Sequence, residues 1–146
     1  MDEGELCSTK AQPAMINSMN AYHILLVGAG GFLGSIARYI TTISIDKKLN
    51  SFFPYGTLTV NLLGSFFLGV ILAVVLKKSG TTAEQWKLLI GTGFCGGFTT
   101  FSAFAFENVS LFEARLAGTA LIYTALSLAF GVVAVWAGML LGRNLI

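Results

Sequence analysis

The chain has 146 residues, of which 55% are hydrophobic and only 11% are charged. Soluble domains carry about 25% charged residues, and the mean hydropathy here is +0.76, so the composition excludes an ordinary soluble domain. The formal net charge is +2, which is too small and too scattered to indicate a nucleic-acid partner.

Polar residues fill the first 21 positions, MDEGELCSTKAQPAMINSMNA. They lack the cationic start of a signal peptide, and we expect a disordered tail over residues 1–21. Met15 and Met19 are alternative starting methionines, so translation of the tail stays open. Cys7, Cys95 and the single His23 indicate neither a disulfide nor a metal framework, and we interpret both cysteines as inert small residues.

Four apolar runs follow, each long enough for a bilayer-spanning helix of roughly 20 residues. They cover residues 22–44, 55–76, 86–112 and 118–141. These runs leave no soluble domain that could hydrolyse a nucleotide. We therefore predict an all-α membrane protein with one transmembrane domain over residues 22–146. It is expected not to be an enzyme but to serve passive conduction, secondary transport or a structural role.

The basic residues flanking the spans give only a weak prediction of how the chain is oriented in the membrane. With four spans, both termini lie on one side, and five basic residues on that side oppose three on the other. Such a small excess is weak under the positive-inside rule. Cytoplasmic termini and insertion in both orientations both stay open, and the second would permit an antiparallel dimer. The first side holds Lys10, Lys77, Lys78, Lys87 and Arg143, and the second holds Lys47, Lys48 and Arg115.

The third run contains Gly91-x-Gly93-x-x-Gly96, the letter pattern of a dinucleotide-binding turn. That interpretation requires a preceding strand and a βαβ unit, which the four-span layout excludes, so no nucleotide is expected. Glycines with Thr99 and Thr100 instead make a poor helix interior and predict a break of the third helix in mid-span. Carbonyls freed there suit a cation, and the helix that restarts presents amides to an anion.

The first run has two informative features. Gly30 and Gly34 form a GxxxG pair, which favours close contact with another helix. Arg38 lies well inside the run, where a charge costs at least about 2.5 kcal/mol. It either snorkels to the membrane surface or lies in an aqueous vestibule and attracts an anion.

In the second run, Thr57, Asn61 and Ser65 recur every four residues and share one helix face. The stripe either holds helices together, as polar side chains do in membranes, or lines a polar track in which the Asn61 amide donates to a passing anion.

Aromatic and hydroxyl side chains mark the third and fourth runs. Phe101 and Phe104 either pack as ordinary core or turn their positive ring edges toward a small anion. Glu107 is either an interfacial carboxylate or a buried acceptor. Tyr123 and Ser127 either belong to a small-residue packing stripe or continue the polar track.

Three blocks of the sequence, taken in order, resemble the Fluc/CrcB fluoride channels over about residues 24–142. The third block is highly specific, and the order of the blocks in a four-span chain makes coincidence remote. The blocks are Gly30-Gly31-x-x-Gly34 with Arg38-Tyr39, then Gly56-Thr57-Leu58-x-Val60-Asn61, then Gly93-Phe94-Cys95-Gly96-Gly97-Phe98-Thr99-Thr100-Phe101-Ser102-x-Phe104 with Glu107.

The resemblance implies an antiparallel, dual-topology homodimer in the cell membrane, with two fluoride pores and a sodium ion at its centre. The sodium would be held by the backbone carbonyls of Gly96 and Thr99. Arg38 matches a vestibule arginine, and Glu107 matches a carboxylate after the break. The implied pore residues are Asn61, Phe101 and Phe104, together with the hydroxyl side chains of Thr57, Ser102, Tyr123 and Ser127.

Two departures from the family pattern stand out. The tail is longer than the motif requires. Ala103 and Ala105 replace hydroxyl or small polar residues that related sequences can carry, so we expect one hydrogen-bonding partner fewer in the track, with the phenylalanine spacing intact.

The function that the resemblance implies is passive, selective export of cytoplasmic fluoride down its electrochemical gradient. A proton-coupled multidrug exchanger is one rival, but it needs a carboxylate in the first run, which has Arg38 and no acid. A non-conducting assembly subunit is the other, but it does not explain why Asn61, Phe101 and Phe104 occur together with the break.

Overall fold

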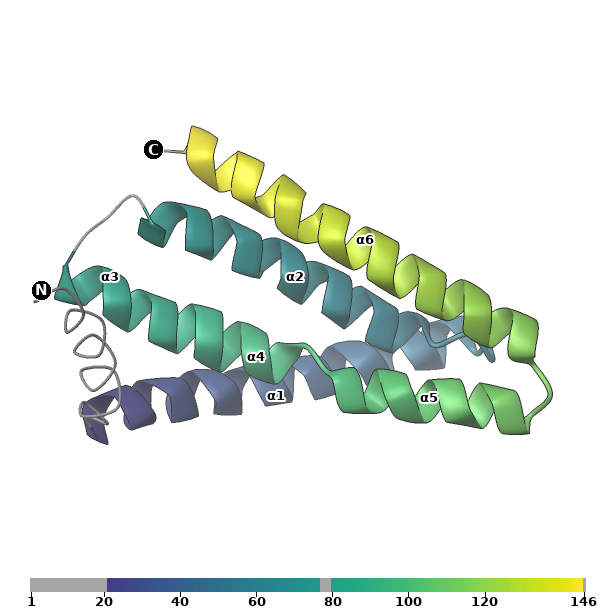
Figure 1. The fold of residues 1–146 in the computed structure, drawn as a ribbon. Coiled ribbons are helices and arrows are strands. Elements are labelled where there is room, and N and C mark those ends of the chain that lie inside the picture. Colours follow the sequence, from purple (N-terminus) through teal and green to yellow (C-terminus); the bar gives the residue numbers. More distant parts are fainter. Residues whose placement is uncertain (1–20, 77–79, 146) are drawn as a thin grey trace, which may run out of the picture.

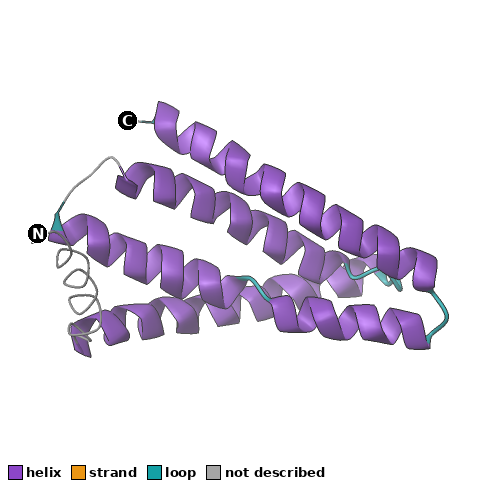
Figure 2. Cartoon of the chain, viewed as in Figure 1, coloured by secondary structure: helices purple, strands orange, loops and turns teal. Residues whose placement is uncertain are grey.

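The computed structural model describes residues 21–76 and 80–145, and these form helices without any strand (Figures 1 and 2). Four helical segments within this part of the chain are long and apolar enough to cross a membrane. The predicted all-α membrane fold with four spans is therefore confirmed. The expected tail lies outside the described residues, apart from Ala21, which begins the first helix.

The spans begin and end close to the predicted runs. The first helix continues past the apolar run through Lys47 and Lys48, since cations are favourable at a helix C-terminus. The second has the predicted bounds, and the third is built from four consecutive segments. In chain order the elements are α1 (Ala21–Leu49), α2 (Tyr55–Leu76), α3 (Thr81–Trp86), the π-helix η2 (Lys87–Cys95), α4 (Gly96–Phe98), α5 (Phe101–Glu113) and α6 (Ala117–Asn144).

Successive spans run in opposite directions, so α1 begins and α6 ends at the same end of the bundle (Figure 1). Helix α2 packs along α6, and α1 packs along η2 and α4. Asp46, near the end of α1, accepts a hydrogen bond from the Gly56 amide at the start of α2, at 2.9 Å. A carboxylate is favourable at a helix N-terminus, so this contact holds the first connector in place.

The third span breaks two residues after the glycine cluster rather than within it. Gly91, Gly93 and Gly96 all lie in helical segments. The extended residues are Thr99 (φ −87°, ψ 158°) and Thr100 (φ −152°, ψ 121°). The predicted mid-span break is confirmed, and it falls on the two threonines at the end of the predicted segment, not on its glycines.

Close approach of two backbones explains what the glycines do instead. A methyl group at Gly30 would overlap the carbonyl oxygen of Leu89, and one at Gly34 would overlap that of Phe94. A methyl group at Gly97 would lie 2.5 Å from the carbonyl oxygen of Gly31. Small residues allow such approach between membrane helices, so the predicted GxxxG contact is confirmed and its partner is the third span.

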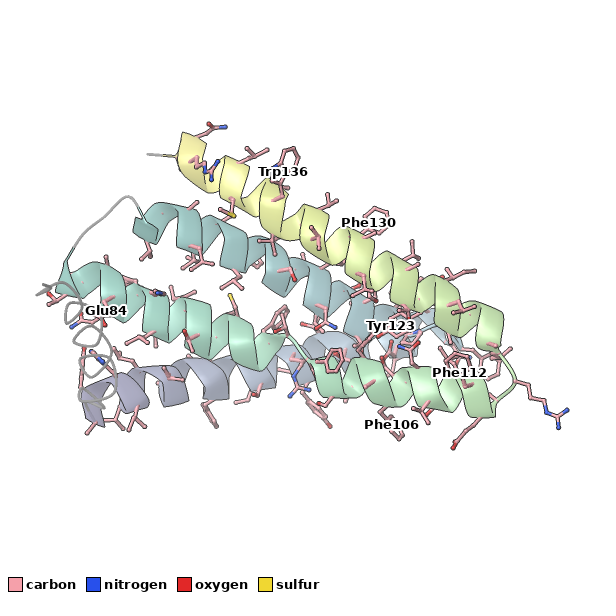
Figure 3. All side chains as sticks on the ribbon, viewed as in Figure 1. Glu84, Phe106, Phe112, Tyr123, Phe130 and Trp136 are labelled. Atoms are coloured by element: carbon pink, nitrogen blue, oxygen red, sulfur yellow. The ribbon has the colours of Figure 1, made fainter. Side chains whose placement is uncertain are left out.

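Large apolar side chains cover the outside of the bundle. Phe130 and Trp136 project outward from α6, and Phe106 projects outward from α5 (Figure 3). Each is more than half exposed in the single chain. A surface of this kind fits hydrocarbon or a neighbouring subunit.

Candidate functional site

The site is built around the extended backbone between α4 and α5. Thr99 ends α4 with two bonds to the Cys95 carbonyl, one from its amide and one from its hydroxyl, each at 2.9 Å. Thr100 begins α5, because its hydroxyl oxygen accepts from the Ala103 amide at 3.2 Å. Threonine is a favourable N-cap. The two threonines therefore define the break through their own side chains.

Asn61 of α2 bonds to the extended backbone at the break through both ends of its side-chain amide. Its amide nitrogen donates to the Thr100 carbonyl at 3.1 Å, and its carbonyl oxygen accepts from the Thr100 amide at 2.7 Å. A buried backbone group without a partner costs about 1–3 kcal/mol, so these bonds stabilise non-helical backbone inside a span. The amide nitrogen carries a second hydrogen that the Thr100 carbonyl does not use.

Arg38 reaches the same region from α1. Its Nε donates to the Gly97 carbonyl at 3.0 Å, in the last turn of α4. A cation at a helix C-terminus is electrostatically favourable. Arg38 is half-buried and lines neither of the two cavities described below. In the single chain it acts as a cap on the third span.

A cavity of about 490 Å³ opens beside the break. It joins the predicted residues Asn61, Phe101, Phe104 and Ser127 in one space. Its lining also includes Ser65, Lys87, Thr92, Cys95, Gly96, Thr99 and Thr100, with Leu68, Leu72, Gly91, Leu128 and Gly131 completing the wall.

The phenylalanine rings and the serine occupy this cavity in different ways. The centroids of the Phe101 and Phe104 rings lie 5.7 Å apart at 41°. Phe101 is 77% exposed in the single chain, whereas Phe104 packs against the ring of Tyr123 at 5.1 Å. The Ser127 hydroxyl oxygen is buried and has no hydrogen-bond partner among the described residues. An orphaned buried hydroxyl at a cavity wall is available to a ligand.

Glu107 forms a separate polar cluster one turn beyond Phe104. Its carboxylate accepts from the Thr57 hydroxyl at 2.5 Å and from the Tyr123 hydroxyl at 2.7 Å. Both partners are buried. Glu107 is thus a half-buried acceptor that joins α2, α5 and α6. It also borders a second cavity of about 460 Å³ that Asp46 lines as well.

The structure therefore brings together some of the predicted pore residues and separates others. Thr57 and Tyr123 bond to Glu107 instead of lining the first cavity. Ser102 is exposed, and its hydroxyl lies 3.2 Å from that of Thr100. The shared face of Thr57, Asn61 and Ser65 thus connects the Glu107 cluster to the first cavity.

The carbonyls of Gly96 and Thr99 fit a hard cation. In a continuous helix they would accept from the amides of Thr100 and Ala103, but those amides bond to Asn61 and to the Thr100 hydroxyl. A side chain at Gly96 would meet no atom within 4 Å, so the Cβ side of this residue borders open space. In the described ranges no group of three His, Cys, Asp or Glu residues could hold a metal ion.

Three residues of the site were missed at the sequence level. Thr100 carries the usual N-cap signal of a threonine before a helix, which pointed to its role. Lys87 and Thr92 are five residues apart, and an α-helical period places them on different faces. The π-helix has i→i+5 hydrogen bonds, and it brings both to the cavity. The sequence of this segment carries no pattern from which a π-helix would be predicted.

These features define a multi-pass membrane protein whose polar groups converge on a broken helix. A model of the CrcB-like protein, Camphor Resistance (CrcB), matches residues 25–139. The chain belongs to this CrcB family, as the resemblance of its three motif blocks predicted.

Curated relatives carry the name fluoride-specific ion channel FluC. The one from Caulobacter sp. (strain K31) is 42% identical over 122 residues, which is 84% of this chain and 95% of the relative. That from Agrobacterium fabrum is 42% identical over 123 residues, 84% of this chain and 98% of the relative. That from Flavobacterium psychrophilum is 37% identical over 122 residues, again 84% and 98%. These names describe channels and not enzymes.

Proposed function

We propose that this protein is a passive, selective fluoride channel. The observation that carries the proposal is the cavity at the break, in which Asn61, Phe101, Phe104 and Ser127 meet. It lies in a four-span chain whose relatives are named as fluoride channels. An anion that leaves water needs donors in place of its hydration shell, and these donors must not hold it too tightly.

Each lining group has a distinct part in this mechanism. The second amide hydrogen of Asn61 and the unpartnered hydroxyl of Ser127 donate to the ion. The edges of the two phenylalanine rings carry partial positive charge and complete the shell. The hydroxyls of Thr57 and Tyr123 donate to Glu107. They can donate to the ion only after they give up these hydrogen bonds.

The working unit is proposed to be an antiparallel homodimer that conducts through two pores. Phe101 leaves most of its ring uncovered in the single chain, and a second subunit would close that side of the cavity. The balanced basic residues on the two sides give little preference for either orientation. Under an inside-negative potential, each fluoride ion is driven outward by about 2.3 kcal/mol per 100 mV.

A structural sodium ion at the dimer centre is proposed to be held by the carbonyls of Gly96 and Thr99. One chain offers two such oxygens, and a symmetry-related copy would supply two more. When bound, the cation screens these carbonyls from one another. Replacement of sodium by N-methylglucamine should weaken the dimer on size exclusion. If the fraction of dimer is the same with and without sodium, the proposed sodium site is contradicted.

Fluoride efflux from proteoliposomes tests the main proposal. Vesicles loaded with equal potassium fluoride and potassium chloride, with valinomycin added so that potassium leaves with the anion, should release fluoride, followed with an ion-selective electrode, and should retain chloride. Protein-free vesicles serve as the control. Equal release of both ions, or release of neither, would contradict the assignment.

A further inference from the structure

Lys87 lies at the end of the first cavity that is farthest from the break. It is the first residue of η2, and the cavity continues from it along the third span past Thr92 and Cys95 to Phe101. Lys87 is exposed, yet it belongs to a segment apolar enough to cross a membrane. Lys87 therefore lines the space that leads to the site.

The charges around the two cavities differ in sign. Among the described residues that line the first cavity, Lys87 is the single charged one. Asp46 and Glu107 line the second cavity, and the described part of its wall contains no lysine or arginine. Within the described ranges no carboxylate pairs with Lys87, although Glu84 lies one turn before it. Arg38 is bonded to the Gly97 carbonyl and borders neither space.

The wall between Lys87 and the break is suited to carry this field. Leucines 68, 72 and 128 make much of it apolar, and low-dielectric walls focus the field of a charge into the adjoining cleft. Hydroxyls of Ser65 and Thr92 line the same wall and offer weak donors on the way. A positive mouth followed by neutral donors attracts an anion without trapping it.

We propose that Lys87 is an electrostatic determinant of the rate of fluoride entry, which raises the local concentration of the anion at the mouth leading to Asn61 and Phe101. This role rests on the proposed channel function. It differs from simple snorkelling, in which a lysine only keeps its charge in water, because it makes the flux depend on charge and on salt.

The experiment compares initial fluoride efflux from vesicles of neutral phosphatidylcholine at ionic strengths of about 10 mM and about 1 M, where the Debye length is about 30 Å and about 3 Å. Potassium gluconate sets the ionic strength on both sides. A unit charge acting over about 10 Å of water changes local anion concentration roughly twofold. Lys87→Gln should therefore be about twofold slower at low salt and should approach wild type at high salt.

Two further variants and a control complete the design. Lys87→Glu should be slower still at low salt, and Lys87→Arg, which keeps the charge, should match wild type. Lys48→Gln removes a lysine that lines neither cavity and should leave efflux unchanged. This inference alone would be overturned if the wild type conducts and Lys87→Gln has the same efflux rate at both ionic strengths. It would also be overturned if the variant is slower by the same factor at both. A wild type that releases no fluoride would overturn the channel function and this role with it.

Discussion

At the scale of single residues, one asparagine supplies both a donor and an acceptor to the backbone at the break. The Asn61 side chain donates to and accepts from Thr100, so the extended backbone keeps its partners away from water. The same side chain lines the cavity beside Phe101. The alternatives of structural support and anion contact are therefore not exclusive at this position, because the amide nitrogen has two hydrogens.

Substitution of Asn61 by Asp tests both roles. The aspartate loses the donor and places a charged oxygen beside the Thr100 carbonyl, so the free energy of unfolding should fall by about 1–3 kcal/mol. Loss of a hydrogen bond to the ion should slow efflux roughly ten- to hundredfold. Both are measured in parallel, by thermal unfolding in detergent and by the fluoride electrode.

Asn108→Ala is the matched control for Asn61. Asn108 also joins two helices, donating to the Phe104 carbonyl and accepting from Thr124, but it borders neither cavity. Its loss should destabilise the protein while efflux stays near that of wild type. Equal efflux from Asn61→Asp and wild type would return Asn61 to a purely structural role.

Phe101 tests the contribution of ring edges. Because this ring is 77% exposed in the single chain, Phe101→Ile should disturb folding of the subunit little. An aromatic interaction is worth about 0.5–1.5 kcal/mol, so efflux should slow roughly two- to tenfold. The control is Phe112→Ile, on the same helix and outside both cavities. Equal loss in both variants would indicate a general packing effect.

At the scale of elements, the contact between α1 and the third span depends on glycine. The glycines of η2 and α4 lie against those of α1. They therefore form a packing surface and are not the residues at which the third span breaks. Their cost as poor helix formers is offset by close packing of two backbones.

Gly30→Ala should destabilise this contact, whereas Gly28→Ala should not. A methyl group at Gly30 overlaps the Leu89 carbonyl, while one at Gly28 meets no atom within 4 Å. Overpacking costs about 1–3 kcal/mol, and Gly→Ala at an open helical position gains up to about 1 kcal/mol. Thermal unfolding followed by tryptophan fluorescence should separate the two variants. Indistinguishable midpoints would refute the packing role of Gly30.

At the scale of the whole molecule, the orientation of the bundle in the membrane depends on small differences in charge between its two ends. The apolar exterior itself favours neither orientation. Figure 1 shows both chain ends of the bundle on one side, so the turn between α5 and α6 lies on the other. A probe on that turn reports orientation without altering the helices.

Ala114→Cys, in a Cys7→Ser background, supplies such a probe without changing the charge. Ala114 is exposed in the turn, and the remaining Cys95 is buried. In spheroplasts, a membrane-impermeant maleimide should label about half of the molecules from outside if both orientations insert. The Cys7→Ser parent gives the background labelling. Complete labelling, or none, would establish one orientation and exclude the antiparallel dimer.

Local sequence is enough to predict the four spans, a break within the third and the types of residue around it. Hydropathy over about 20 residues is a strong local signal, and the motif blocks are specific. The exact position of the break and the choice of hydroxyls that face the cavity depend on contacts between helices. The glycines tolerate helix because α1 packs against them, and Thr99 and Thr100 open because Asn61, 39 positions away from Thr100, binds the freed backbone. The helix propensity of the third span predicts neither effect, because α1 and Asn61 belong to other helices.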